Sequence, residues 1–295
     1  GGRKVGFIQL DTLSIRWTQV SDMRGRIARD CGFPGDGIMV AATHNHAGPA
    51  VANCGDVRRD DAYIETMVAK VVSMFGQAVA AVQEAEIGFG RCCEFGVTHN
   101  RRVVMRDGTV RTHGTFDNPD ALFLEGPIDP EVAVLAARAA DGKTLGAVVN
   151  FACHPTHHGD GTALTAGFPG VLARIMKARG CPVTVFLNGA SGNISDSDPC
   201  RGGAHMSKEE IGRILADDTS SVLSEMRYSS AATLGSRSRT VRLPFRAATA
   251  DEIKGRVRGA ERFMLELASA LDDTYDVTLL CGGTLAPSPR KAIRL

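Results

Sequence analysis

Residues 131–155 read EVAVLAARAADGKTLGAVVNFACHP, and this stretch decides the fold class. Two apolar runs, Glu131–Ala137 and Thr144–Cys153, flank Asp141-Gly142, a dipeptide typical of the tight turn between antiparallel strands. The stretch therefore predicts a β-hairpin whose second strand leads directly into His154. A polar residue straight after a buried strand is typical of the sheet edge at which α/β proteins place their sites.

Helix-like and strand-like segments alternate upstream of this hairpin. Buried strands are predicted over Lys4–Asp11 and Gly37–Thr43, with a helix over Gln19–Cys31 between them. Apolar residues at helical spacing predict a long helix over Asp61–Glu86. The next section, Ile87–Asp129, is rich in turn dipeptides, so we expect β-hairpins and irregular loops there.

The same alternation continues downstream. Two of the helices expected there open on a capping box, a Ser or Thr followed three residues later by Glu. The expected elements are a helix from Pro169 to about Arg179, a strand over Pro182–Leu187, a helix from Ser207 through Met226, a strand over Ala231–Phe245 and a helix from Thr249 to about Leu271.

The composition is that of a globular α/β protein. Apolar residues make up 43% of the 295 and charged residues 23%, which excludes a disordered chain. A formal net charge of +1 and an aromatic content of 5% argue against a nucleic-acid partner. No apolar run approaches the roughly 18–20 residues of a transmembrane segment. We expect an α/β fold with a mixed β-sheet core flanked by helices and an irregular β-hairpin-rich insertion, forming a single catalytic domain over 1–295.

The cysteines bear on the cellular compartment. All eight are scattered, and none form a CxxC pair. Scattered free thiols favour a reducing compartment, and therefore a cytoplasmic protein over an exported one. The sequence opens on Gly1-Gly2 directly before an apolar run, so we expect the natural chain to begin further upstream, and export remains an alternative.

Three polar clusters each follow directly after a predicted buried strand. They read THNHAGP (43–49), CHPTHH (153–158) and NGASGNIS (188–195). Alternate residues of an extended segment face the same side, so His44 and His46 can point into one cavity. His154 occupies a matching position after another strand, and imidazoles suit zinc. The pattern predicts a Zn²⁺ site, with His157 and His158 interpreted as surface residues.

The third cluster and a pair of arginines are less specific. The segment Gly-Ala-Ser-Gly-Asn departs from the serine-hydrolase elbow at Asn193, where the elbow has Gly. As a small-residue turn it could hold a carbonyl or oxyanion through backbone N–H groups, or be only a tight turn. Arg101 and Arg102 could bind a carbonyl or carboxylate, although loop arginines are usually solvated. There is no P-loop, GxGxxG or HExxH motif.

With these motifs in hand, the sequence resembles the neutral/alkaline, non-lysosomal ceramidase family, in particular the N-terminal domains of its bacterial members. The resemblance rests on THNHAGP (43–49), NRR (100–102), NFACHP (150–155) and SGNIS (191–195), in the family's order. It implies a zinc-dependent amidohydrolase that cleaves an N-acyl amide, a ceramide-like lipid or small-molecule amide, to a fatty acid and an amine.

The resemblance also implies roles for individual residues. These are His44 and His154 as Zn²⁺ ligands, His46 as a proton carrier beside the metal, Arg101 and Ser195 as catalytic partners of the oxyanion, and Asn193 as a substrate-binding residue. The family takes its remaining zinc ligands, a Glu and a Tyr, from a later region. We therefore expect them beyond Leu295, in a longer gene product of which this chain is a fragment truncated at both ends.

Two other functions fit the residues in part. A different metal-dependent amidohydrolase, built as a (β/α)₈ barrel with His-x-His on its first strand, would need eight regular βα units. The irregular stretch 87–129 and the hairpin at 131–153 argue against that regularity. A degenerate, metal-free binding module is the second alternative, and a measured metal affinity would separate it from an enzyme.

Overall fold

The computed structural model describes residues 4–54, 57–156, 163–231 and 235. The helix predicted from Thr249 lies outside these residues, as do His157, His158 and, apart from its first residue and Gly235, the strand predicted over 231–245. No helix in the described part of the chain combines the length and the apolar composition needed to cross a membrane.

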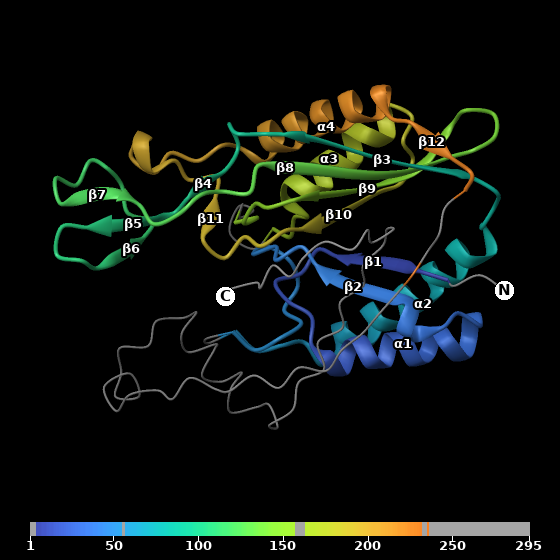
Figure 1. The fold of residues 1–295 in the computed structure, drawn as a ribbon. Helices are drawn as coiled ribbons and strands as arrows, with labels where there is room; N and C mark the ends of the chain where they lie inside the picture. Colours follow the sequence, from blue (N-terminus) through green and yellow to red (C-terminus); the bar gives the residue numbers. More distant parts are fainter. Residues whose placement is uncertain (1–3, 55–56, 157–162, 232–234, 236–295) are drawn as a thin grey trace.

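A five-stranded mixed sheet forms the centre of the molecule (Figure 1). The predicted hairpin is confirmed as an antiparallel pair, and the turn glycine, Gly142, has a φ of 85° that favours glycine. The strand at one edge of the sheet, Thr184–Asn188, runs parallel to its neighbour, Thr144–Phe151. The order across the sheet is β10 (Thr184–Asn188), β9 (Thr144–Phe151), β8 (Glu131–Arg138), β3 (Glu86–Cys93) and β12 (Tyr228–Ser229).

A second sheet lies beside β10 and is formed by two parallel strands, β1 (Gly6–Leu10) and β2 (Ile38–Ala42). The side chain of Gln9 joins the two sheets, because its Oε1 accepts a hydrogen bond from the backbone N–H of Phe186 in β10 at 2.6 Å. Both strands lie inside the ranges predicted for them. The expected α/β fold with a mixed β-sheet is therefore confirmed.

Within the described residues, four helices cover the sheets from opposite sides (Figure 1). On one side α3 (Gly167–Ala178) and α4 (Lys208–Glu225) pack on the five-stranded sheet, and on the other α1 (Trp17–Cys31) and α2 (Asp61–Ala80) pack on β1 and β2. Each side has its own apolar core. The largest fully buried side chains include Phe151, Phe168, Phe186, Leu172, Ile211 and Leu215 in the first core and Met23, Ile27, Ile38 and Val68 in the second.

The predicted capping box at the start of α4 is confirmed. The Ser207 hydroxyl accepts from the backbone N–H of Glu210 at 3.2 Å, and the Glu210 carboxylate accepts from the Ser207 N–H at 2.9 Å. Both bonds satisfy backbone N–H groups at the start of the helix, so this helix start is specified locally.

The boundary between α2 and the insertion differs from the prediction. The helix ends at Ala80 rather than Glu86, and residues 86–93 form β3 inside the central sheet. Two glycines of this strand make room for α4 and the residues that follow it. A Cβ atom on Gly88 would lie 2.5 Å from the Met226 sulfur, and one on Gly90 would lie 2.7 Å from Val222.

The remainder of the insertion is rich in hairpins, as predicted. A three-stranded antiparallel sheet extends from the body at the left of Figure 1. Its strands, in order, are β6 (Val110–Thr112), β5 (Arg102–Met105) and β7 (Ala121–Leu124). The short elements beside it are β4 (His99–Asn100), β11 (Ile194–Ser195) and the 3₁₀ helix η2 (Pro199–Arg201). A second 3₁₀ helix, η1 (Gly35–Gly37), precedes β2. The antiparallel pairing of β4 with β11 brings the insertion to the third polar cluster.

Candidate metal centre

The loops that follow β2, β9 and β10 meet at one place and carry the three polar clusters. Backbone hydrogen bonds join the first two loops, because the His46 N–H donates to the Pro155 carbonyl at 3.3 Å. The first loop is also tied to the end of β1. There the Thr43 N–H donates to Leu10 at 2.9 Å and the Asn45 N–H donates to Thr12 at 3.1 Å.

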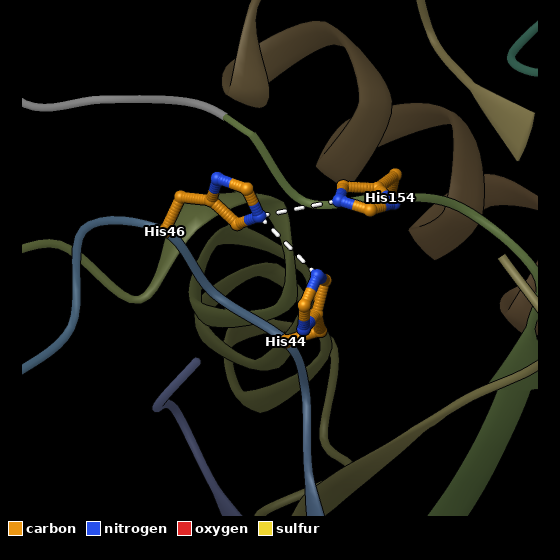
Figure 2. A group of neighbouring side chains, drawn as sticks. All are labelled: His44, His46 and His154. Atoms are coloured by element: carbon orange, nitrogen blue, oxygen red, sulfur yellow. Dashed lines mark hydrogen bonds between the residues drawn. The ribbon is translucent and has the colours of Figure 1, made fainter. Parts of the chain in front are cut away.

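Three imidazole rings converge where these loops meet (Figure 2). The Nε2 atom of His46 lies 3.3 Å from Nε2 of His44 and 3.1 Å from Nε2 of His154. The ring centroids of His44 and His154 are 4.5 Å apart, and one nitrogen from each of the three rings lies within 4.8 Å of the other two. This is the spacing at which three nitrogens can bind one cation.

Two of the rings have a defined tautomer. The Nδ1 atom of His44 lies 2.8 Å from the Leu13 carbonyl, and Nδ1 of His154 lies 3.0 Å from the Ser191 carbonyl. A carbonyl only accepts, so each Nδ1 bears the hydrogen and each Nε2 keeps its lone pair. A hydrogen bond of this kind orients a metal-binding imidazole and raises its basicity. The donor set fits a Zn²⁺ ion.

His154 is electrostatically suited to stay neutral. Burial, together with smaller effects of the nearby charges of Arg101, His44 and His46, lowers its pKa to about 3 against the raising effect of the hydrogen bond to Ser191. The side chain is 6% exposed. Since a metal binds the neutral form of imidazole, burial keeps this ligand ready at neutral pH. His46, in contrast, is exposed.

The backbone of His44 is strained. Its φ of 64° lies in the left-handed region that few residues other than glycine adopt. This conformation is held by the backbone hydrogen bonds of the neighbouring residues Thr43 and Asn45 to the end of β1, and by the buried side chain of Asn45. That amide donates to the Thr165 carbonyl and accepts from the Ala47 N–H, the latter at 3.0 Å. Strain of this kind clusters at functional sites.

Arg101 lies against the third polar cluster. Its backbone N–H donates to the Asn193 carbonyl at 2.9 Å, and its Nη2 donates to the Gly192 carbonyl at 2.7 Å. Burial, with a smaller effect of Arg102, lowers its pKa. Its Nε–H is buried and has no hydrogen-bond partner in the part of the chain that the structure describes. One donor of the guanidinium is therefore left for another group, whereas Arg102 is paired with Glu125.

Ser195 and Asn193 occupy the same loop in different ways. Ser195 is fully buried; its hydroxyl donates to the Asp196 carboxylate at 3.3 Å and accepts from the Ser197 N–H at 3.2 Å. Both partners belong to its own loop. Asn193 contributes a backbone carbonyl to Arg101. The structure thus places the three histidines together and Arg101 on the third cluster, and pairs the Ser195 hydroxyl locally.

One residue of this region gives no signal in the sequence. His113, in the insertion, has a φ of 59° and lies beside Arg101. Its Nε2 is 3.2 Å from Nη1 of Arg101, and because arginine only donates, this nitrogen is the acceptor. His113 belongs to no motif, so only the folded chain identifies it as a neighbour of Arg101.

A small cavity adjoins the first loop. It has a volume of about 210 Å³ and is lined by Asp11, Ala47, Gly48, Pro49, Leu164, Thr165 and Ala166. Burial raises the pKa of Asp11 against its hydrogen bonds to Gln9 and Thr43. A larger hollow, about 440 Å³, is lined by seven residues of α1 between Trp17 and Arg29 and by none of the predicted site residues.

Comparison with known proteins finds a partial similarity of sequence and a shared fold. No model of a protein family matches the chain. The neutral ceramidase of Pseudomonas aeruginosa is 28% identical over an alignment of 134 residues, which covers 42% of this chain and 19% of that protein. The matched stretch therefore spans about a fifth of the length of this curated relative.

Two solved structures share the fold. The crystal structure of neutral ceramidase from Pseudomonas aeruginosa matches with a TM-score of 0.61 and 20% identity, over 80% of this chain and 39% of that one. A ceramidase complexed with C2 matches with a TM-score of 0.64 and 20% identity, over 80% and 38% of the two chains. The chain is therefore similar in sequence to a neutral ceramidase over part of its length, and it shares the fold of the two solved ceramidases.

Proposed function

We propose that the protein is a zinc-dependent amidohydrolase that cleaves the N-acyl amide of a ceramide-like lipid into a fatty acid and an amine. One observation carries the proposal: His44, His46 and His154 present nitrogens within 4.8 Å of one another from two separate loops. Similarity to a neutral ceramidase, and to a solved ceramidase complexed with C2, supports the substrate class.

His44 and His154 are the ligands that we assign to the cation. Their Nδ1–H groups are held by backbone carbonyls, so both rings are already oriented with the Nε2 lone pair available to a cation. When bound, zinc polarises a carbonyl and lowers the pKa of water toward about 7.

His46 is assigned to proton transfer. Its ring is exposed, and its Nε2 lies 3.1 Å and 3.3 Å from the corresponding atoms of the two ligands. An imidazole in this position can take a proton beside the reacting amide and release it to the leaving amine or to solvent, because imidazole changes charge near neutral pH.

Arg101 and the third cluster are assigned to the amide carbonyl. The unpaired Nε–H of Arg101 is the donor available to the oxygen that gains negative charge, and the guanidinium keeps its own charge at any working pH. Asn193 anchors the backbone of Arg101, and we assign it to substrate binding. Ser195 is assigned to the same oxyanion, which requires its hydroxyl to exchange the Asp196 partner for substrate.

Zinc content and amidase activity of the full-length protein test the proposal. We expect the double variant His44→Ala with His154→Ala to lose bound zinc and hydrolysis of a fluorescent N-acyl amide. The matched control is His205→Ala, a histidine outside the trio. Unchanged zinc content and activity in the double variant would overturn the proposal. A zinc dissociation constant weaker than about micromolar in the unaltered protein, roughly 8 kcal/mol, would favour the metal-free binding module.

The variant His46→Gln separates a proton carrier from a third ligand. We expect its zinc affinity to stay within about threefold of the unaltered protein while kcat falls by roughly 10²–10⁴, the usual contribution of acid–base catalysis. A loss of zinc affinity as large as that of His154→Ala would show that His46 is a ligand and not the proton carrier.

A further inference from the structure

The side chain of Asn188 connects the two loops that carry the histidines. Asn188 is the last residue of β10. Its Nδ2 donates to the Thr43 carbonyl at 2.9 Å, and its Oδ1 accepts from the Cys153 N–H at 3.3 Å. Thr43 directly precedes His44, and Cys153 directly precedes His154. One amide group is therefore bonded to the backbone immediately before each proposed ligand.

The surroundings leave this amide little freedom. Thr43 and Cys153 are completely buried. Gly189, the residue after Asn188, packs tightly on the end of β9 and the loop that follows it. Its N–H donates to the Phe151 carbonyl at 3.0 Å, and a Cβ atom on Gly189 would lie 2.9 Å from Cβ of Ala152. The ends of β9 and β10 thus hold the Asn188 side chain against both loops.

Both bonds need an amide. Asparagine offers a donor and an acceptor on one short side chain, and the two bonds use one of each. An aspartate has the same shape and can still accept from Cys153, but it turns a carboxylate oxygen toward the Thr43 carbonyl. A leucine of similar volume makes neither bond and leaves both backbone groups unsatisfied.

We propose that Asn188 is a positioning residue of the metal centre, which sets the separation of the His44 and His154 loops and thereby the affinity for the cation. The inference rests on the proposed function only in requiring that these histidines bind zinc. Groups that orient metal ligands typically contribute 10–100-fold to metal affinity, which is the range expected for Asn188.

The test is a Zn²⁺ titration of the metal-free, full-length protein against a competing chelator, with Co²⁺ absorption as a report on ligand geometry. We expect Asn188→Leu to weaken zinc binding 10–100-fold and to alter the Co²⁺ spectrum, and Asn188→Asp to weaken it about tenfold. The matched control is Asn150→Ala in the neighbouring strand. Its amide donates to the Leu187 carbonyl at 2.7 Å and reaches neither loop, so its affinity should stay within about twofold.

Urea unfolding of the metal-free variants separates positioning from folding. A merely structural Asn188 would lower the unfolding midpoint and leave the zinc dissociation constant and the Co²⁺ spectrum of the folded protein unchanged, and that result would overturn the inference. If Asn188→Leu does not fold, the isosteric Asn188→Asp decides by the same criteria. If the unaltered protein binds no zinc, the proposed function fails and the inference fails with it. If it binds zinc and both variants match Asn150→Ala, only the inference fails.

Discussion

Gly48→Ala should disturb the metal centre through the backbone, without removing any ligand. Gly48 lies four residues after His44 on the same loop. A Cβ atom there would lie 2.3 Å from the Asp11 carbonyl oxygen and 3.1 Å from Cα of Thr12, whereas ordinary contacts begin at 3.4 Å. Both neighbours are backbone atoms, so they cannot rotate away, and the loop must move from the end of β1 by about 1.1 Å.

This movement determines the expected loss of zinc affinity and of stability. The His44 ring bond to the Leu13 carbonyl, 2.8 Å long, joins the same two segments and would stretch beyond hydrogen-bonding distance. The loss of that orientation should weaken zinc binding roughly 10–100-fold. Overpacking typically costs about 1–3 kcal/mol. For a chain of this size that lowers the melting temperature by roughly 2–10 °C.

Calorimetry of the metal-free protein and a zinc titration measure the two effects. The matched control is Gly192→Ala, on the loop after β10, where an added Cβ atom meets nothing within 4 Å. If Gly48→Ala and Gly192→Ala agree within about 1 °C in melting temperature and about twofold in zinc affinity, the close approach between these loops does not position His44 and the reasoning is wrong.

Three further predictions concern other parts of the molecule. Burial and the charges of Glu94 and Asp217 raise the pKa of Asp218 from 3.8 to about 6. The folded protein therefore favours the protonated carboxyl, and the free energy of unfolding falls as the pH rises from about 4 to about 6. In urea unfolding, Asp218→Asn should be more stable than the unaltered protein above pH 6, and the difference should vanish near pH 4. The full shift corresponds to about 3 kcal/mol, which screening of this partly exposed group reduces to about 1 kcal/mol. Arg101→Lys should lower amidase kcat roughly 10²-fold, because an ammonium cannot bond Gly192 and a substrate oxygen as one fork, and equal kcat values would refute this role. Ser207→Ala should lower the free energy of unfolding by about 1 kcal/mol through loss of the α4 cap, with Ser224→Ala near the end of α4 as the control that should change it little.

The elements that the sequence predicts well are those specified by near neighbours. The hairpin of β8 and β9 follows from Asp141-Gly142 between apolar runs, and α4 follows from a capping box whose two partners are three residues apart. The strand β3 escaped prediction because its glycines serve a distant helix. Only contact with Met226 and Val222 of the α4 region explains why Gly88 and Gly90 lie in a strand rather than a turn.

The sequence also predicted which side chains form the candidate metal site. The His-x-His pair and the His-Pro segment supply ligand types suited to zinc, and their positions after buried strands predict that they lie at one sheet edge. The assignments of Arg101, Asn193 and Ser195 rest on resemblance, and the structure adds which backbone groups hold them. His113 belongs to no motif and was not predicted. Asn188 opens the third cluster, but its hydrogen bonds to both histidine loops were not predicted, because their partners are 145 and 35 residues away.

The sequence by itself determined most of the strands, the capped helix α4 and the side chains that could bind a cation, because those properties depend on residues a few positions apart. Only the tertiary structure decided that the rings meet, which nitrogen of His44 and of His154 keeps its lone pair, and what holds their loops. Those outcomes depend on partners 31, 37 and 108 residues away in the chain. Contacts at such distances are made when the sheets and their helices bury a common core, and no local pattern records them.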